Sequence, residues 1–153
     1  QTMLSVKRVR EHGAGDLPEF RLCEEAAKGA SSIWKLYYQG SVGGQALVGL
    51  PVVKRLRDSR ATRIWPFETG WRALSPSDLD GVEAVFAEIY PSLLASKSAP
   101  GATKDEAQVR AACERFNSLD EKFQLGALFG PRRDDPQREV VENQEGWILD
   151  VGA

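Results

Sequence analysis

Residues 82–94 have the sequence VEAVFAEIYPSLL, and this stretch decides the predicted fold. From Val82 to Ile89 both sets of alternate positions are mainly apolar, which is typical of a central strand covered on both faces. Pro91 ends the strand, because proline cannot donate a hydrogen bond to the ladder of a sheet. We therefore expect a buried strand at 82–89, in the middle of a sheet.

Glu88 interrupts this apolar stretch close to the carboxyl end of the strand. An ionised carboxylate in such a place costs several kcal/mol unless it is paired or bound to a cation, so Glu88 is either structurally satisfied or functional. In open α/β sheets, ligands and catalytic groups gather at the carboxyl ends of the strands. We therefore take Glu88 as the first candidate site residue, and expect it to be largely buried and to face a polar cleft.

The composition is that of a globular protein. The chain has 153 residues, 42% hydrophobic and 27% charged, which predicts one domain over 1–153. It has no run near the ~18 apolar residues of a membrane span, and its net charge of −2 does not draw the whole surface towards nucleic acid or anionic lipid. Cys23 and Cys113 lack zinc-site or disulfide spacing, which favours reduced thiols in a cytoplasmic protein. Because the chain starts at Gln1 and has its only methionine at Met3, we expect a truncated, processed or renumbered beginning.

Helical periodicity predicts three helices flanking the sheet, at 21–39, 43–58 and 104–119. Pro51 should kink or restart the second helix, because its nitrogen cannot bond back to residue 47. Thr103 and Glu106 form a capping-box pattern at the start of the third. A basic stretch follows Val53, formed by Lys54, Arg55, Arg57, Arg60 and Arg63. It is either a solvated helix face or a patch that contacts phosphate.

A second strand is predicted at 62–67, where β-branched and aromatic residues are frequent, with a third near 4–9. The predicted fold class is therefore α/β. Glu68 directly follows the second strand and could supply another carboxylate at the same end of the sheet. Asp105 lies in the first turn of the third helix, where an acid also stabilises the helix dipole without any further role.

Five stretches carry a resemblance to a known family: SIWKLYYQGSVGGQALVGLP, RIWPFETGW, AEIYPSLL, TKDEAQVRA and EGWILDVG. Together they resemble an uncharacterised bacterial family whose members are often labelled cobalamin-biosynthesis or molybdopterin-guanine-dinucleotide-biosynthesis proteins. That family is similar in turn to predicted nucleases of RNase H-like fold, in which a strand ending in Glu-x-x-Pro carries an active-site acid. The resemblance covers most of the chain from about Pro18. It implies that Glu88 matches the strand-end glutamate and that Asp105 matches a helix acid.

The sequence departs from the family pattern at its beginning. Family members carry a preceding half, with an Asp-Trp-Ser type motif after its first strand and another Asp on a later strand, and neither motif occurs here. The resemblance therefore implies the C-terminal part of a longer RNase H-like protein, with a partial sheet flanked by helices. It also implies that catalysis needs acids from elsewhere. Because two or three strands are few for a sheet whose central member is apolar on both faces, we expect the chain to form a homo-oligomer or to associate with a missing N-terminal half.

The chemistry that the resemblance implies depends on divalent cations. RNase H-like enzymes hold two such ions about 4 Å apart, and Mg²⁺ or Mn²⁺ selects carboxylate oxygens that converge from separate elements. Glu88 and Asp105 are the candidate catalytic residues, and Glu68 joins them as a candidate metal ligand. Nucleic acid or a nucleotide would then be the substrate or ligand.

Three hypotheses therefore stand. The chain is a metal-dependent phosphodiesterase or nuclease, an accessory or enzymatic protein of cobalamin or molybdopterin biosynthesis, or a structural and interaction half without catalysis.

Overall fold

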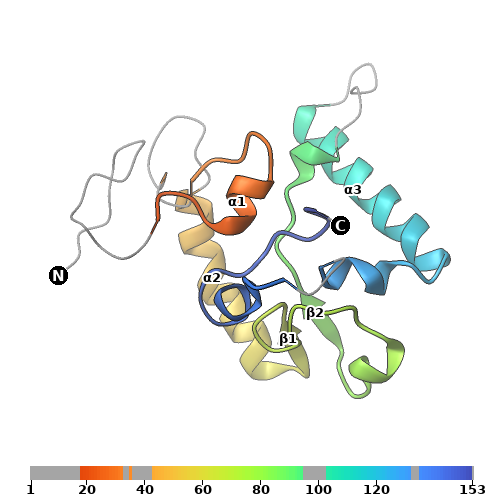
Figure 1. Ribbon diagram of the computed structural model, residues 1–153. Helices are drawn as coiled ribbons and strands as arrows, with labels where there is room; N and C mark the ends of the chain where they lie inside the picture. The colour runs from red at the N-terminus through yellow and green to blue at the C-terminus, as the bar shows by residue number, and fades with distance from the viewer. Residues whose placement is uncertain (1–17, 33–34, 36–42, 95–102, 132–134, 153) are drawn as a thin grey trace. The chain divides into compact units, whose positions relative to one another are not determined.

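The computed structural model describes residues 18–32, 35, 43–94, 103–131 and 135–152 (Figure 1). Contacts within the chain divide it into two compact units, Gln1–Thr62 and Arg63–Ala153, which are described separately. The single domain expected over 1–153 stays a prediction. The third strand expected near 4–9 lies outside the described residues.

The first unit begins with the short helix α1 (Leu22–Ala26), which buries Cys23 and Ala27. The carboxylate of Glu24 closes its first turn, accepting hydrogen bonds at 3.0 Å from both the backbone N–H and the Nε of Arg21. The helix predicted at 21–39 is wrong at residues 27–32 and 35, which are not helical. Ala27 is extended and Gly29 has a φ of +86°, a left-handed conformation that ends helical geometry. The end of the predicted helix lies outside the described residues.

The second helix of this unit, α2 (Gly43–Ser59), confirms the helix predicted at 43–58. Pro51 lies inside it, so the helix continues through the proline and does not restart there. The other described helix of this unit, α1, does not pack along its length. The side chains of α2 are exposed at nearly every described position.

A small parallel sheet consists of β1 (Thr62–Ile64) and β2 (Ala84–Phe86). Apart from its first residue, β1 belongs to the second unit. Just after it, the backbone N–H of Trp65 donates to the carbonyl of Phe86 at 2.9 Å. The prediction that 62–67 and 82–89 contribute to one sheet is thus confirmed. The wider α/β class is consistent with this mixture of helix and sheet.

Both strands are shorter than predicted, for different reasons. After Ile64 the chain enters a turn, in which the N–H of Glu68 donates to the carbonyl of Ile64 at 2.8 Å. After Phe86 the extended chain changes its partner. Glu88 forms an isolated parallel bridge with Ile148, and its carbonyl accepts the N–H of Leu149 at 2.9 Å. β2 therefore ends where the chain changes its pairing partner. The hydrophobic pattern alone does not reveal this change.

The predicted burial of the 82–89 stretch on both faces is wrong. None of these residues is fully buried, and Glu88 and Ile89 are exposed. In the part of the chain that the structure describes, the sheet has two strands of three residues each, so β2 lacks the neighbours that would enclose a central strand.

The core of the second unit is formed by buried side chains from the loop after β1 and from the C-terminal segment, and not by the 82–89 stretch. The indole rings of Trp71 and Trp147 stack at a centroid distance of 4.7 Å, inclined by 41°. Trp65 meets Phe129 edge-on at 5.7 Å and donates its Nε1–H to the Phe129 carbonyl at 2.8 Å. Val141 is completely buried. Trp147 likewise donates its Nε1–H to the Val151 carbonyl at 3.0 Å. The indole N–H groups of Trp65 and Trp147 thus find acceptors inside the core, as is usual for buried indoles.

The remaining elements of the second unit surround this core. The helix predicted at 104–119 is confirmed as α3 (Lys104–Glu121). The short helical turns are η1 (Pro76–Leu79), η2 (Pro91–Leu93), η3 (Leu125–Phe129), α4 (Arg138–Val140) and η4 (Val141–Glu145).

Two glycines let the chain following Trp71 approach η3 very closely. A Cβ atom on Gly126 would lie 2.0 Å from the carbonyl oxygen of Leu74, and one on Gly130 would lie 2.4 Å from the backbone nitrogen of Ala73. The Leu74 N–H donates to the Gly126 carbonyl at 2.9 Å. Side chains at these two glycines would prevent this backbone contact.

Candidate functional site

Glu88, the first candidate, lies two residues after β2 with its side chain exposed. Its position at the carboxyl end of the strand agrees with the sequence prediction, whereas its predicted burial is wrong. An exposed carboxylate keeps its hydration, so the argument that it must be paired or bound to a cation no longer applies. The structure positions Glu88 through its backbone, which is held by Ile148 and Leu149.

Asp105 is exposed in the first turn of α3. The predicted cap of this helix is partly confirmed, because Thr103 Oγ1 accepts the N–H of Glu106 at 3.2 Å. The Glu106 carboxylate, however, accepts from Arg110 one turn later, also at 3.2 Å. Asp105 is therefore well placed to favour the helix dipole.

One side-chain contact links the regions of these two acids. Gln108 Nε2, on α3, donates to Ser92 Oγ on η2 at 3.0 Å. Ser92 follows Glu88 by four residues and Gln108 follows Asp105 by three. The contact therefore fixes the first turns of α3 beside the segment that leaves the carboxyl end of β2.

Glu68, the third candidate ligand, is half-buried and already has a structural role. Its Oε2 accepts the backbone N–H of Ile64 at 2.7 Å, which closes the turn after β1. This bond uses one carboxylate oxygen for the local fold. Among the described residues, no group of three or more His, Cys, Asp and Glu side chains could hold a metal ion.

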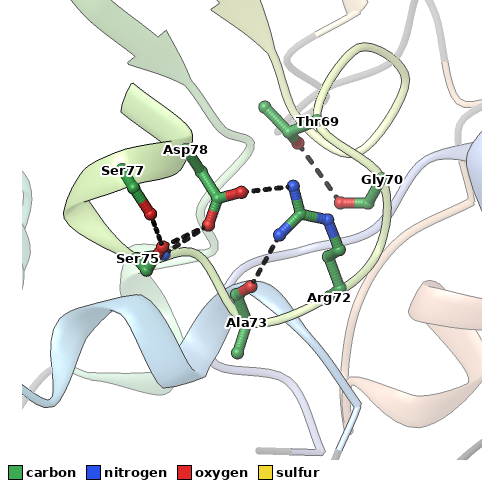
Figure 2. A network of polar contacts seen from close by, with 7 residues as sticks. All are labelled: Thr69, Gly70, Arg72, Ala73, Ser75, Ser77 and Asp78. Atoms are coloured by element: carbon green, nitrogen blue, oxygen red, sulfur yellow. Dashed lines mark hydrogen bonds and ion pairs between the residues drawn. The ribbon is translucent and has the colours of Figure 1, made fainter. Parts of the chain in front are cut away.

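One polar network of the second unit was not predicted from the sequence. Figure 2 shows the guanidinium of Arg72 between the Asp78 carboxylate and the Ala73 carbonyl, with contacts of 2.7 and 3.3 Å. The backbone N–H and the hydroxyl of Ser75 also donate to Asp78, at 2.8 and 2.6 Å. Hydrogen bonds from Arg72 and then Ser75 hold the pKa of Asp78 well below its ordinary value.

This network stabilises the loop between the strands. Ser75 and Asp78 have the Ser-x-x-Asp spacing of a capped helical turn, which was the available sequence signal. Arg72 itself is about half exposed. Because the Asp78 carboxylate lies this close, the charge of Arg72 is already neutralised. The network therefore stabilises a turn of the fold and is not a binding site.

The largest unexplained surface belongs to α2. Five of its large apolar side chains are between 37% and 74% exposed, and we call them the α2 apolar surface: Leu47, Val48, Leu50, Val52 and Leu56. Sequence reasoning assigned this helix to the flank of a sheet and did not expect the exposure. The sequence did contain a signal of this exposure. The apolar residues of α2 surround the helix instead of occupying one side, which is typical of helices that other elements enclose.

The basic stretch that follows on α2 is partly neutralised within the helix. Asp58 accepts from Lys54 at 2.5 Å and lies 3.6 Å from Arg57. The hydrogen bond from Lys54 lowers the pKa of Asp58. These side chains are exposed, which is what a solvated helix face predicts.

Comparisons of the chain with protein-family models, with curated proteins and with solved structures found no match. The resemblance described from sequence motifs therefore stays a prediction. In the described parts of the chain, no helix has both the length and the apolar character that a membrane span requires.

Proposed function

We propose that the chain is an interaction half, which completes its structure by associating with another polypeptide through α2. The α2 apolar surface carries this proposal. A helix that is apolar around its circumference is normally enclosed by other elements, whereas single exposed apolar side chains on a surface need no explanation. Here five of them lie within ten positions of one helix.

The composition of α2 supports the same conclusion. Gly43, Gly44, Gly49 and Pro51 all lie within it. Relative to alanine, each glycine costs about 1 kcal/mol and the proline about 3 kcal/mol in a helix interior. Most helices in proteins obtain their stability from packing rather than from propensity. A helix with such poor propensity and so much exposed apolar surface needs a partner to pack against.

Substitution of Leu47 and Leu50 by aspartate tests the proposal. In the highly diluted chain, the double variant should change the free energy of unfolding by less than about 0.5 kcal/mol, because exposed positions tolerate such changes. Ala27→Asp is the matched control in the same unit, since Ala27 is buried and a charge there destabilises strongly. Urea unfolding measures both. If the double variant destabilises the diluted chain as much as the control does, α2 is covered within the chain and the proposal fails.

A metal-dependent phosphodiesterase is the second candidate function. The Gln108–Ser92 contact favours it, because it holds the segments of Asp105 and Glu88 together, and both residues are exposed. Hard carboxylate oxygens suit Mg²⁺ or Mn²⁺. Glu88 and Asp105 would hold the ion, which would supply water activation and charge stabilisation at a phosphodiester. Two acids form part of such a site, so the remaining ligands would come from an associated polypeptide.

Titration of the chain with Mn²⁺, followed by electron paramagnetic resonance, tests this candidate independently of activity. We expect weak binding that Glu88→Gln and Asp105→Asn both abolish. Glu83→Gln removes an exposed carboxylate just before β2 and should bind like the parent chain. Equal binding in all four proteins, or none in the parent, would exclude a metal site at Glu88 and Asp105. A role in cobalamin or molybdopterin biosynthesis stays a prediction of the resemblance.

A further inference from the structure

The turn that leads from η1 into β2 contains the single Asp-Gly pair of the sequence, Asp80–Gly81. Asp80 has a φ of −58° and a ψ of 121°, and Gly81 has a φ of +73°. The backbone N–H of Val82 donates to the Leu79 carbonyl at 2.9 Å. These angles and this hydrogen bond define a type II turn with Asp80 and Gly81 at its two corners. Both corner residues are exposed to solvent.

We propose that Asp80–Gly81 is a site of covalent modification, at which the main chain rearranges spontaneously to an isoaspartyl linkage. In the rearranged chain, Gly81 is attached to the side-chain carbonyl carbon of Asp80 instead of its main-chain carbonyl carbon. Residue 80 then carries a free α-carboxylate, which is the group that isoaspartate-specific carboxyl methyltransferases recognise. This inference does not depend on the function proposed for α2 or on cation binding at Glu88 and Asp105.

The rearrangement proceeds in two steps and involves only water besides the chain. First the amide nitrogen of Gly81 attacks Cγ of the protonated Asp80 carboxyl group. The N–Cγ bond forms, the amide hydrogen leaves with the carboxyl hydroxyl group as water, and the product is a succinimide ring. Water then opens this ring by breaking the bond from nitrogen either to Cγ, which restores Asp80, or to the main-chain carbonyl carbon, which leaves the isoaspartyl linkage. One water is released and one is taken up, so the composition of the chain is unchanged.

The surroundings of this turn leave both reacting groups accessible. Within the described part of the chain, no hydrogen bond or ion pair engages the Asp80 carboxyl group, and the Gly81 N–H has no backbone acceptor. Glycine also lacks the Cβ atom that hinders approach to the nitrogen, and the space where this atom would stand is open. Asp78 provides the contrast, because its carboxylate is held by Arg72 and Ser75 and the next residue is a leucine.

The turn can bring the two groups together without unfolding. Rotation of the peptide unit between Asp80 and Gly81 converts a type II turn into a type I turn, and the hydrogen bond between the first and fourth residues is compatible with both. Gly81 tolerates both signs of φ. In one direction of this rotation the Gly81 nitrogen swings past Cβ of Asp80 and comes within reach of Cγ. The conformational change that the reaction requires is thus confined to one peptide unit.

The isoaspartyl linkage should loosen the start of β2. It adds one methylene group to the main chain at the corner of the turn, so the Val82 N–H no longer meets the Leu79 carbonyl. Val82 lies two residues before β2, whose carbonyl at Phe86 accepts the Trp65 N–H. We expect this Trp65 N–H to exchange with solvent several-fold faster in the isoaspartyl form than in the parent chain. An unchanged exchange rate would overturn this consequence for the sheet.

Incubation of the full chain in water enriched in the heavy oxygen isotope tests the modification itself. Each opening of the ring places one solvent oxygen in the new carboxyl group, whether the product is aspartyl or isoaspartyl. Trypsin cleavage after Arg72 and Lys97 then gives the peptide 73–97, which contains both Asp80 and Asp78, and fragmentation in the mass spectrometer locates the label. We expect roughly ten-fold more label at Asp80 than at Asp78, which serves as the internal control.

Asp80→Glu is the matched variant, because glutamate keeps the charge but would have to close a ring larger by one atom, which forms much more slowly. After the same incubation, an isoaspartate-specific carboxyl methyltransferase with a labelled methyl donor should modify the parent chain and leave Asp80→Glu unmodified. Equal label at Asp78 and Asp80, or equal methylation of the two proteins, would overturn the proposal. Label that enters Asp80 in urea but not in the folded chain would also overturn it, because the native turn would then hold the bond in place.

Discussion

At the scale of single residues, Gly126 is the position least able to accept a side chain. We expect Gly126→Ala to lower the free energy of unfolding by about 3 kcal/mol, the upper end for overpacked sites, because the new methyl group would lie 2.0 Å from the Leu74 carbonyl oxygen. Urea unfolding of the second unit measures the change.

Gly44→Ala is the control for this substitution. Nothing lies within 4 Å of a Cβ at Gly44, and the residue is inside α2, so alanine there should stabilise the helix by up to ~1 kcal/mol. If Gly126→Ala were as well tolerated, the backbone contact between η3 and Leu74 would not exist in solution.

Asp78 should make stability depend on pH in the acid range. Its pKa is lowered in the folded chain, so its ion pair with Arg72 contributes fully above the ordinary pKa of 3.8 and is lost as the pH falls towards the folded value. Asp78→Asn should therefore be less stable than the parent at pH 7, and the difference should shrink below about pH 4. Thermal unfolding between pH 2 and 7 measures it, with the exposed neighbour substitution Asp80→Asn as the control. A difference that does not vary with pH would show that the Arg72–Asp78 pair is unimportant.

At the scale of elements, the two long helices were predictable, whereas the two strands were predictable in position but not in their limits or burial. The start of α3 follows from a local signal, the Thr103 cap, which acts within a few residues. The limits of β2 depend on pairing with Ile148, sixty residues away in sequence from Glu88. Local hydrophobic pattern cannot report such a partner. It also cannot report that the described sheet has two strands, which leaves the end of β2 and Glu88 exposed.

The Thr103 cap gives a prediction for α3. Thr103→Ala should destabilise the second unit by about 1 kcal/mol, because it removes the acceptor of the Glu106 N–H. Thr103→Ser keeps the hydroxyl oxygen and should restore most of this loss. Chemical unfolding measures both variants. Equal stability of the alanine and serine variants would mean that water replaces the cap without cost.

At the scale of the whole molecule, the core of the second unit is formed within its own residues. The ring partners of Trp65, Trp71 and Trp147, and the carbonyls that accept the indole N–H groups of Trp65 and Trp147, all follow Arg63 in the sequence. We therefore expect a fragment of residues 60–153, which retains all of β1, to fold by itself. The indole N–H groups of Trp65 and Trp147, bonded to the carbonyls of Phe129 and Val151, should exchange slowly with solvent in NMR spectra.

The matched fragment 1–61 serves as the comparison, because it contains α2 without that core. It should show little cooperative unfolding when diluted. A 60–153 fragment whose indole protons exchange at the rate of an unfolded chain would contradict the prediction.

The candidate site was predictable in its residue types but not in its assembly. Glu88 and Asp105 were placed correctly at a strand end and a helix start. Whether carboxylates share a ligand depends on side-chain directions and on the loop at 91–103, which local sequence does not determine. The α2 apolar surface could have been found, because its residues lack the one-sided pattern of a helix that flanks a sheet.

The stacked tryptophans have a further consequence. Two indole rings 4.7 Å apart and inclined by 41° lie close enough for their electronic transitions to couple, and the coupled transitions of such a chiral pair absorb left- and right-circularly polarised light unequally. The Trp71–Trp147 pair should therefore give a circular dichroism signal that reports on the folded state. Because Trp71 and Trp147 are separated by 76 positions, the signal is present when the two ends of the second unit have come together, and it requires no added label.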